Sequence, residues 1–339
     1  MLTKILLGTY TKNKSQGIYS ITLDTQQEDL CDLTLIAKEV GPTYLAQSKA
    51  GQLFNVTSVE GKGGIASYDA NYHLVNTVTQ EGASPCYVAI DEKRQLVYSA
   101  NYHKGQVAVY QILADGQIAL VDEVFHHDPV GPHENQDKPH AHYADLTPDD
   151  RLVACDLGTD FVYTYDVSAQ GKLTKVASLK LPAGTGPRHL AFHPQLDIAY
   201  LFGELNSTIT ILTYHRKTGE FSIGASYSTL PNDFVGFNSG SAVHITSDGR
   251  FLYGSNRGHN SIVCFEISED GQQLTFNQRI QSEGDFPRDF AIDPSEEYLV
   301  CAHQNSDNLT LFYRDKQTGI LSLLKKDIFA PECVCVKFI

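Results

Sequence analysis

A pattern of strands and turns that recurs at a period of roughly 45 residues constrains the fold more than any other feature of this sequence. Each copy reads as a strand, a turn, a second strand, a polar loop and a third strand, followed by a Gly-bearing turn and a fourth apolar run. This order is typical of a four-stranded antiparallel sheet. The clearest copies are "PCYVAIDEKRQLVYSANYHKGQVAVYQI", "PHAHYADLTPDDRLVACDLGTDFVYTYDV", "PRHLAFHPQLDIAYLFGELNSTITILTY", "SAVHITSDGRFLYGSNRGHNSIVCFEI" and "PRDFAIDPSEEYLVCAHQNSDNLTLFYR".

The two ends of the chain complete the set of sheets. A looser copy, "PTYLAQSKAGQLFNVTSVEGKGGIASYD", precedes the clear ones, residues 3–40 contain three further strands, and "PECVCVKFI" supplies one more. Joining strands from both ends removes the open edges that a linear β array would expose. No segment keeps the 3.6-residue period of an amphipathic helix. We therefore predict one all-β domain over residues 1–339, a seven-bladed β-propeller of four-stranded antiparallel blades, its ring closed by the C-terminal strand joining the N-terminal strands.

Charge and cysteine content limit the partners and the compartment. The chain has 26 Lys and Arg against 40 Asp and Glu, a net charge of −14. Nucleic acid and anionic membranes are bound by clustered Lys and Arg, so we expect neither as a partner. The 7 cysteines lack the spacing of a zinc ribbon or a disulfide framework, and the apolar run in "MLTKILLGTY" is too short for a signal peptide or a membrane span. We expect a soluble cytoplasmic protein without a metal ion or other cofactor, a monomer or a weak homo-oligomer.

Aligning the copies on the turn between their first two strands brings charged residues into two rows. One row lies where the first strand begins and contains His142, Arg188 and Arg288, with Thr43, Cys86 and Ser241 in the other copies. The second row lies where the second strand ends and contains Glu204, Arg257 and Gln304. In an antiparallel pair the start of one strand and the end of the next lie at the same edge. We therefore expect both rows at one mouth of the propeller channel.

The arginines of these rows have two interpretations. Guanidinium groups that converge on a concave rim favour an anionic ligand, because the planar fork pairs with two oxygens of a phosphate or carboxylate. Arginines can also tie neighbouring blades through ion pairs to carboxylates such as Asp156 or Glu204. We favour the ligand, since a chain this acidic needs local cations to hold an anion.

The histidines of "KPHAHYADLTPDD" also have competing interpretations. His140 and His142 face one side of a strand, but a zinc site needs further ligands, and His133 and His189 have no metal-site spacing. A structural pair is possible, while the register shared with the arginines favours an acid/base or hydrogen-bonding role for His142. His259 and His103 lie in loops at the same edge. They have two interpretations, as contacts to a ligand or as ordinary solvated loop residues. We expect Cys86 to be an inert packed thiol, and the chain has no G-x-S-x-G, P-loop or Rossmann pattern.

The sequence resembles the seven-bladed propeller lactonase family, which includes propeller-type 6-phosphogluconolactonases and carboxymuconate-lactonizing enzymes. The resemblance covers essentially the whole chain and is most specific in "PHAHYADLTPDDRLVACDLGTD", "GPRHLAFHP", "FGELNST", "GSNRGHNSI" and "FPRDFAIDP". It implies catalytic or substrate-binding roles for His142, Arg188, Glu204 and Arg257. Two departures concern ligand choice: Asn135 stands where the family often has Arg before Gln136, and His303 stands where Asn is commoner.

The resemblance implies hydrolysis of 6-phosphoglucono-1,5-lactone, a small anionic substrate. In the mechanism that we expect, Glu204 or His142 is the general base for water, Arg188 and Arg257 stabilise the oxyanion, and further contacts to substrate come from Arg288 near the phosphate and from His140, His259 and Gln304. A cycloisomerase or a lactonase for an unphosphorylated sugar would use the same arginines. A non-enzymatic propeller scaffold is disfavoured because the chain has no tryptophan, the residue richest in protein-binding hot spots.

Overall fold

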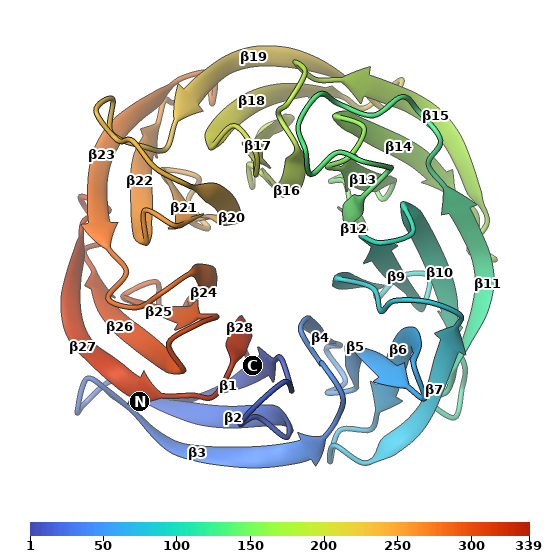
Figure 1. Ribbon diagram of the computed structural model, residues 1–339, viewed down its shortest axis with the longest axis horizontal. Coiled ribbons are helices and arrows are strands. Elements are labelled where there is room, and N and C mark those ends of the chain that lie inside the picture. Colours follow the sequence, from blue (N-terminus) through green and yellow to red (C-terminus); the bar gives the residue numbers. More distant parts are fainter. The chain divides into compact units, whose positions relative to one another are not determined.

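The computed structural model describes residues 1–339 and contains 28 strands and no helix. The strands form seven separate four-stranded sheets (Figure 1). These sheets are the blades of a β-propeller, so the predicted all-β, seven-bladed fold is confirmed. No helix is present that is long and apolar enough to cross a membrane.

The first blade is made from both ends of the chain, as predicted. Its hydrogen-bonded order is β28 (Cys333–Phe338), β1 (Leu2–Thr9), β2 (Gly17–Asp24) and β3 (Asp29–Lys38). In the antiparallel pair of β1 and β28, Leu7 lies opposite Val336. β2 pairs with one edge of β1 and β28 with the other, so β1 has no exposed strand edge.

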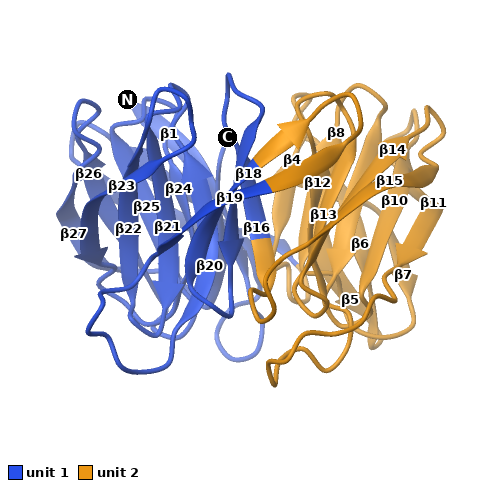
Figure 2. Cartoon of the chain, turned by 90° about the horizontal axis from the view of Figure 1, so that it is seen from above, with its two compact units in different colours: residues 1–38, 189–212, 223–339 blue, residues 39–188, 213–222 orange.

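Packing divides the chain into two compact units (Figure 2). Unit 1 contains residues 1–38, 189–212 and 223–339, and unit 2 contains residues 39–188 and 213–222. That they make up a single domain stays a prediction from the sequence. Unit 2 contains three whole blades: β4 (Leu45–Gln47), β5 (Leu53–Val59), β6 (Lys62–Tyr68) and β7 (Leu74–Gln80); β8 (Tyr87–Asp91), β9 (Leu96–Asn101), β10 (Gln106–Ile112) and β11 (Ile118–Phe125); β12 (Ala141–Leu146), β13 (Leu152–Asp156), β14 (Phe161–Val167) and β15 (Leu173–Lys180).

Unit 1 contains the blade of both chain ends and two further whole blades. These are β20 (Ser239–Ile245), β21 (Phe251–Arg257), β22 (Ser261–Ile267) and β23 (Leu274–Gln281), and β24 (Pro287–Ile292), β25 (Tyr298–His303), β26 (Asn308–Arg314) and β27 (Leu321–Phe329). The remaining blade has residues in both units and contains β16 (Pro187–Phe192), β17 (Ile198–Gly203), β18 (Thr208–His215) and β19 (Glu220–Ser228).

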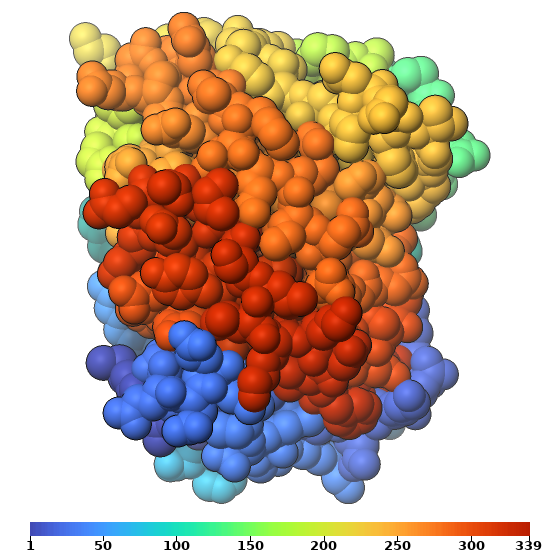
Figure 3. Space-filling model, turned by 90° about the vertical axis from the view of Figure 1, so that its left-hand side faces the viewer, coloured from blue at the N-terminus to red at the C-terminus, as the bar shows by residue number.

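The apolar core lies between neighbouring blades. In unit 1, Phe251 and Tyr253 of β21 pack with Phe290 of β24 and Phe312 of β26 in one buried cluster. Every residue of β21 and β25 is buried, as expected for strands covered on both faces. The outer strands β23 and β27 instead expose many of their residues. Figure 3 shows the side of the molecule on which the orange and red segments of these last blades adjoin.

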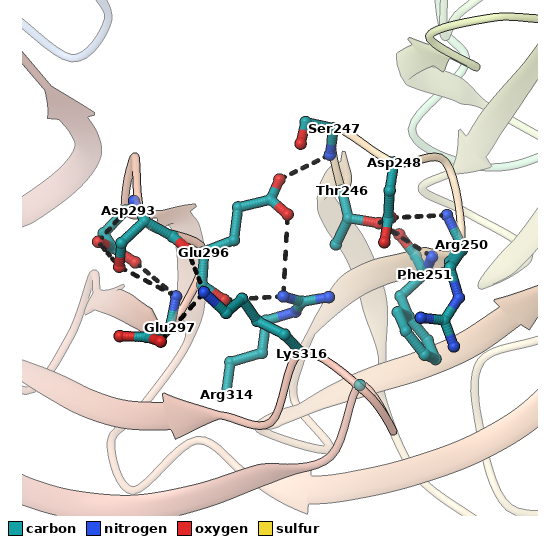
Figure 4. Close-up of polar contacts among 12 residues, drawn as sticks. Thr246, Ser247, Asp248, Arg250, Phe251, Asp293, Glu296, Glu297, Arg314 and Lys316 are labelled. Atoms are coloured by element: carbon teal, nitrogen blue, oxygen red, sulfur yellow. Dashed lines mark hydrogen bonds and ion pairs between the residues drawn. The ribbon is translucent and has the colours of Figure 1, made fainter.

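One buried arginine ties two blades of unit 1 together (Figure 4). Arg314 ends β26, where its Nε donates to the Tyr253 hydroxyl at 2.8 Å and its Nη1 to the carbonyl of Glu296 at 2.7 Å. The Glu296 carboxylate accepts the backbone N–H of Ser247 at 2.6 Å, so the turns of adjacent blades are joined. Arg314 lies at the strand end away from Asn308, hence at the edge opposite the predicted rows. Arg314 therefore ties neighbouring blades together, which is the structural role that we considered for arginines in the sequence.

Candidate active site

The structure places both rows at equivalent positions of successive blades. His142, Arg188 and Arg288 are each the second residue of the first strand of a blade, in β12, β16 and β24. Arg257 is the last residue of β21, while Glu204 and Gln304 directly follow β17 and β25. The register that the sequence predicted for these residues therefore holds, although their catalytic and binding roles stay predictions.

In three blades the first row coincides with a β-bulge, which spacing alone did not reveal. In β12 the register shifts between Ala141 and Tyr143, and in β24 between Pro287 and Asp289. His142 and Arg288 are the residues in between, so each lies outside the regular ladder. In β20 the same shift spans Ser241 and Ala242. A bulge bends the strand and redirects a side chain, and bulges are frequent next to active sites.

In unit 1, Glu204 and Arg257 form a nearly buried ion pair. Nη2 of Arg257 lies 2.9 Å from Oε2 of Glu204, and it donates to the Ser239 hydroxyl and the Gly240 carbonyl, each at 2.7 Å. The backbone N–H of Gly240 donates in turn to the carbonyl of Glu204 at 2.9 Å. These contacts fix the guanidinium and the carboxylate relative to each other before any ligand arrives.

One N–H of Arg257 is left without a partner. Arg257 is 4% exposed, and its Nε–H is buried without a hydrogen-bond partner. Burial lowers the pKa of the guanidinium from its ordinary value; the Glu204 carboxylate opposes that change and the nearby Arg288 adds to it. An unsatisfied buried donor costs about 1–3 kcal/mol. An oxygen of a bound substrate would satisfy this donor.

Arg288 and Gln304 form a second pair in unit 1. Nη1 of Arg288 donates to Oε1 of Gln304 at 3.1 Å, and the guanidinium lies 5.7 Å from the ring centroid of Tyr10. The Ser241 hydroxyl donates to the Arg288 carbonyl at 2.6 Å, which holds the bulge. The printed partners of Arg288 are thus the neutral Gln304 amide and the Tyr10 ring. Sequence reasoning missed Tyr10, which follows β1 in the blade built from both chain ends.

His259 lies in the turn after Arg257. Its backbone N–H donates to Asn238 at 3.1 Å, and its Nδ1 lies 2.8 Å from the Ser261 hydroxyl. Burial, followed by the charge of Arg279, lowers the pKa of His259. A neutral imidazole with Nδ1 engaged in this way leaves Nε2 for another contact.

In unit 2, His140 and His142 have different surroundings. Nδ1 of His140 lies 2.7 Å from the Tyr102 carbonyl and Nε2 lies 2.8 Å from Oδ1 of Asp137, and the imidazole stacks on the Tyr102 ring at 4.0 Å. Both ring nitrogens of His140 are thus engaged by the protein. His142 is buried and meets the edge of the Tyr102 ring at 5.9 Å. The thiol of Cys86 faces the His142 carbonyl at 3.7 Å.

Asp160 organises the loop that leads to Arg188. Its Oδ1 accepts the backbone N–H of Gly186 and the side-chain amide of Gln136, both at 2.8 Å, and its Oδ2 accepts the N–H of Gly184 at 2.9 Å. Gln136 is the residue next to the family departure at Asn135, and it lies buried in this loop network. Sequence reasoning did not single out Asp160; the only signal was an acidic residue at the end of the polar loop "LGTD".

No group of three or more His, Cys, Asp or Glu side chains in the structure could hold a metal ion. The most compact His–carboxylate contact, between Nδ1 of His126 and Oδ2 of Asp156 at 2.6 Å, is completed by the Tyr165 hydroxyl at 3.0 Å. This buried triad links β12–β15 to the segment before them. Its geometry is that of a structural hydrogen-bond network.

Comparisons with known proteins agree on one family. The family described as "Lactonase, 7-bladed beta-propeller" matches residues 4–338. A 6-phosphogluconolactonase of Bacillus subtilis is 43% identical over 340 residues, covering 98% of this chain and 97% of the relative. A crystal structure of a Lactobacillus plantarum protein superposes with a TM-score of 0.98 at 48% identity, covering 100% of both chains. A periplasmic gluconolactonase of Pseudomonas aeruginosa superposes with a TM-score of 0.92 at 29% identity, covering 100% of this chain and 99% of that one.

Proposed function

The chain belongs to the seven-bladed β-propeller lactonase family, and on this premise we propose that it hydrolyses 6-phosphoglucono-1,5-lactone to 6-phosphogluconate. The family makes it a lactone hydrolase, and the relative from Bacillus subtilis suggests the substrate. The observation that carries the proposal is the Glu204–Arg257 pair, in which a fixed carboxylate lies 2.9 Å from a guanidinium that retains an unpartnered N–H.

This pair has the two groups that ester hydrolysis needs. The Glu204 carboxylate is the proton acceptor, and the Arg257 guanidinium lies 2.9 Å from it. Water adds to the lactone carbonyl and loses its proton to Glu204, while the negative charge that forms on the carbonyl oxygen is stabilised by Arg257 through Nε–H. The bond between the carbonyl carbon and the ring oxygen then breaks, and the proton held by Glu204 passes to the departing alkoxide.

The substrate's phosphate is assigned to Arg288. This guanidinium is held by the neutral Gln304 and the Tyr10 ring and has no carboxylate partner. A cation without a carboxylate partner suits an anion in a chain with a net charge of −14. His142 and Arg188 as catalytic residues, and His140 and His259 as substrate contacts, remain part of the proposal.

The decisive experiment follows the disappearance of freshly generated 6-phosphogluconolactone with and without the protein, because this lactone also opens spontaneously. We expect a rate well above the spontaneous one, proportional to protein concentration. Glucono-1,5-lactone is the control for the phosphate. If neither lactone is consumed faster than without protein, the proposed function is wrong.

An unphosphorylated sugar lactone is the second candidate substrate, because a gluconolactonase of the same fold superposes over the whole chain. The same assay separates the two: a preference for glucono-1,5-lactone would indicate that Arg288 binds something other than a phosphate. We also propose a cytoplasmic location, which the 7 free cysteines support. The acidic charge supports the absence of nucleic-acid and membrane partners, and light scattering after gel filtration would test for a monomer or weak homo-oligomer.

A further inference from the structure

The exposed Phe237 and the half-buried Phe286 form an aromatic stack beside the Glu204–Arg257 pair. The ring of Phe286 lies with its centroid 5.5 Å from the guanidinium carbon of Arg257. The ring of Phe237 lies parallel to that of Phe286, with centroids 6.2 Å apart and planes at 4°. Phe286 directly precedes β24 and Phe237 lies just ahead of β20, so both rings come from the entries to first strands in unit 1.

The backbone on both sides of this stack is anchored. Asn238 donates to the Ser207 hydroxyl at 2.8 Å and accepts the backbone N–H of His259 at 3.1 Å. The N–H of Phe286 donates to Asn260 at 3.0 Å. The loop before β20 is thus bound to the turn that follows Arg257, and the rings stand on a fixed base.

Gly258 allows the Phe237 backbone to approach Arg257 this closely. It has φ +111°, and a Cβ at this position would lie 2.3 Å from the carbonyl oxygen of Phe237. Any other residue would push the loop away and would be strained at this φ. The Gly that follows Arg257 therefore sets the distance between the aromatic stack and the ion pair.

The exposure of Phe237 requires an explanation. Phe237 is 65% exposed although Phe286 lies beside it. Covering apolar surface is worth roughly 25 cal/mol per Å², so such a ring lowers its free energy when something covers it. The stack lies beside the Glu204–Arg257 pair, whose Arg257 Nε–H has no partner. A group that covers Phe237 would therefore need an apolar face for the ring and an oxygen for this N–H.

We propose that Phe237, supported by Phe286, is a specificity-determining wall of the substrate site that packs against the C–H face of a six-membered sugar lactone. This inference rests on the proposed function and extends it from the reacting carbonyl to the ring. One face of such a ring presents C–H groups with partial positive charge, and the face of an aromatic ring carries partial negative charge. The wall therefore favours a closed pyranose-type lactone over an open-chain ester, independently of a phosphate.

The test compares Phe237→Ala with two matched variants, Phe237→Tyr and Val235→Ala. Val235 lies in the same loop and is 95% exposed, but no ring contact places it in the stack. For Phe237→Ala we expect KM for 6-phosphogluconolactone and for glucono-1,5-lactone to rise by about tenfold each, with kcat within about twofold, the equivalent of about 1.4 kcal/mol in binding. Val235→Ala should retain the wild-type KM, Phe237→Tyr should raise KM less than Phe237→Ala because it keeps the aromatic face, and all three variants should melt at the wild-type temperature.

If the wild type hydrolyses the lactones and Phe237→Ala keeps the wild-type KM, the proposed role of Phe237 is wrong. The proposed function would be unaffected by that result. A fall in kcat without a change in KM would overturn the role of Phe237 equally, since the ring would then act on the chemical step. If the wild type hydrolyses neither lactone, the proposed function fails first. In that event, binding of 1,5-anhydroglucitol, a sugar ring without a carbonyl, is measured by NMR saturation transfer. An equal signal from wild type and Phe237→Ala would show that Phe237 does not bind a sugar ring.

Discussion

The carboxylate of Glu332 accepts the backbone N–H of Ser15 at 3.0 Å, across 317 residues of chain. It also accepts the N–H groups of Lys12, Asn13 and Lys14 at 3.0–3.1 Å, so four consecutive amides surround one side chain. Glu332 directly precedes β28, and the four amides lie between β1 and β2. The blade made from both chain ends is therefore held by this carboxylate as well as by the β1–β28 ladder.

Stability should fall in acid through Glu332. Burial opposes its ionisation, but the N–H groups of Ser15, Asn13, Lys12 and Lys14 outweigh burial and lower the pKa of the carboxyl. A lowered folded pKa means that the stabilisation is present above the unfolded pKa of about 4.3 and is lost as pH falls through the folded value. We expect Glu332→Gln to cost about 1–3 kcal/mol at pH 7 and to weaken the acid dependence of urea unfolding. Parallel pH curves for variant and wild type would contradict this.

Activity should depend on both members of the Glu204–Arg257 pair. Glu204→Gln removes the proposed base and should lower kcat/KM by about 10²- to 10⁴-fold. Arg257→Lys keeps a charge but loses the Nε–H, and should lower kcat by about 10²- to 10³-fold. Circular dichroism and thermal melts report whether each variant folds. Wild-type kcat/KM in both folded variants would place the chemistry elsewhere, for instance at His142 and Arg188.

Arg288→Met should separate phosphorylated from unphosphorylated substrates. Its loss removes the only charge in the group with Gln304 and Tyr10, so we expect KM for 6-phosphogluconolactone to rise by about 10- to 100-fold, about 1.4–2.8 kcal/mol. KM for glucono-1,5-lactone should change less than threefold. Equal changes for the two lactones would show that Arg288 does not contact the phosphate.

Arg314→Met serves as the matched structural variant. It removes a buried hydrogen bond to the Tyr253 hydroxyl of the neighbouring blade and a part-buried one to the Glu296 carbonyl. We expect a loss of about 1–3 kcal/mol in urea unfolding, with KM and kcat unchanged below the melting transition. A change in KM at full folding would mean that the two edges of these blades are coupled.

Asp160→Asn should lower the catalytic rate by loosening the loop that positions Arg188. The carboxylate holds the N–H groups of Gly184 and Gly186 just before β16, and an amide can accept from only one side-chain oxygen. We expect kcat to fall by about tenfold while KM changes little, if Arg188 acts in the chemical step. Asp160→Glu provides the comparison, since it restores both acceptor oxygens. Loss of stability without a change in kcat would reduce Asp160 to a purely structural residue.

Sequence reasoning predicted the blades and the register because both follow from spacing. Pro194, Ser247 and Pro294 mark the same point of the turn in three copies, so counting from them found Arg188, Arg257 and Arg288. Counting could not reveal the bulge at His142 and Arg288, because the extra residue recurs in sister strands and leaves the spacing constant.

Contacts between distant loops were equally hidden from the sequence. Phe237 and Phe286 precede different blades, and only the fold brings their rings together. The same is true of Glu332, whose four partners are backbone amides without a side-chain signature. For His140 the period of two predicted a shared face with His142, but not that Tyr102 and Asp137 engage both of its ring nitrogens.

The bulge in the first strands has a consequence for how such an enzyme can change. A bulged residue has no partner residue in the neighbouring strand. Its replacement therefore leaves the strand register of the blade unchanged. His142, Arg288 and Ser241 occupy this position in three blades whose ladders otherwise continue unchanged. In these three blades one residue at the start of the first strand can therefore change without shifting the strand register, so the ligand contacts of the enzyme can change while its scaffold keeps the same pairing.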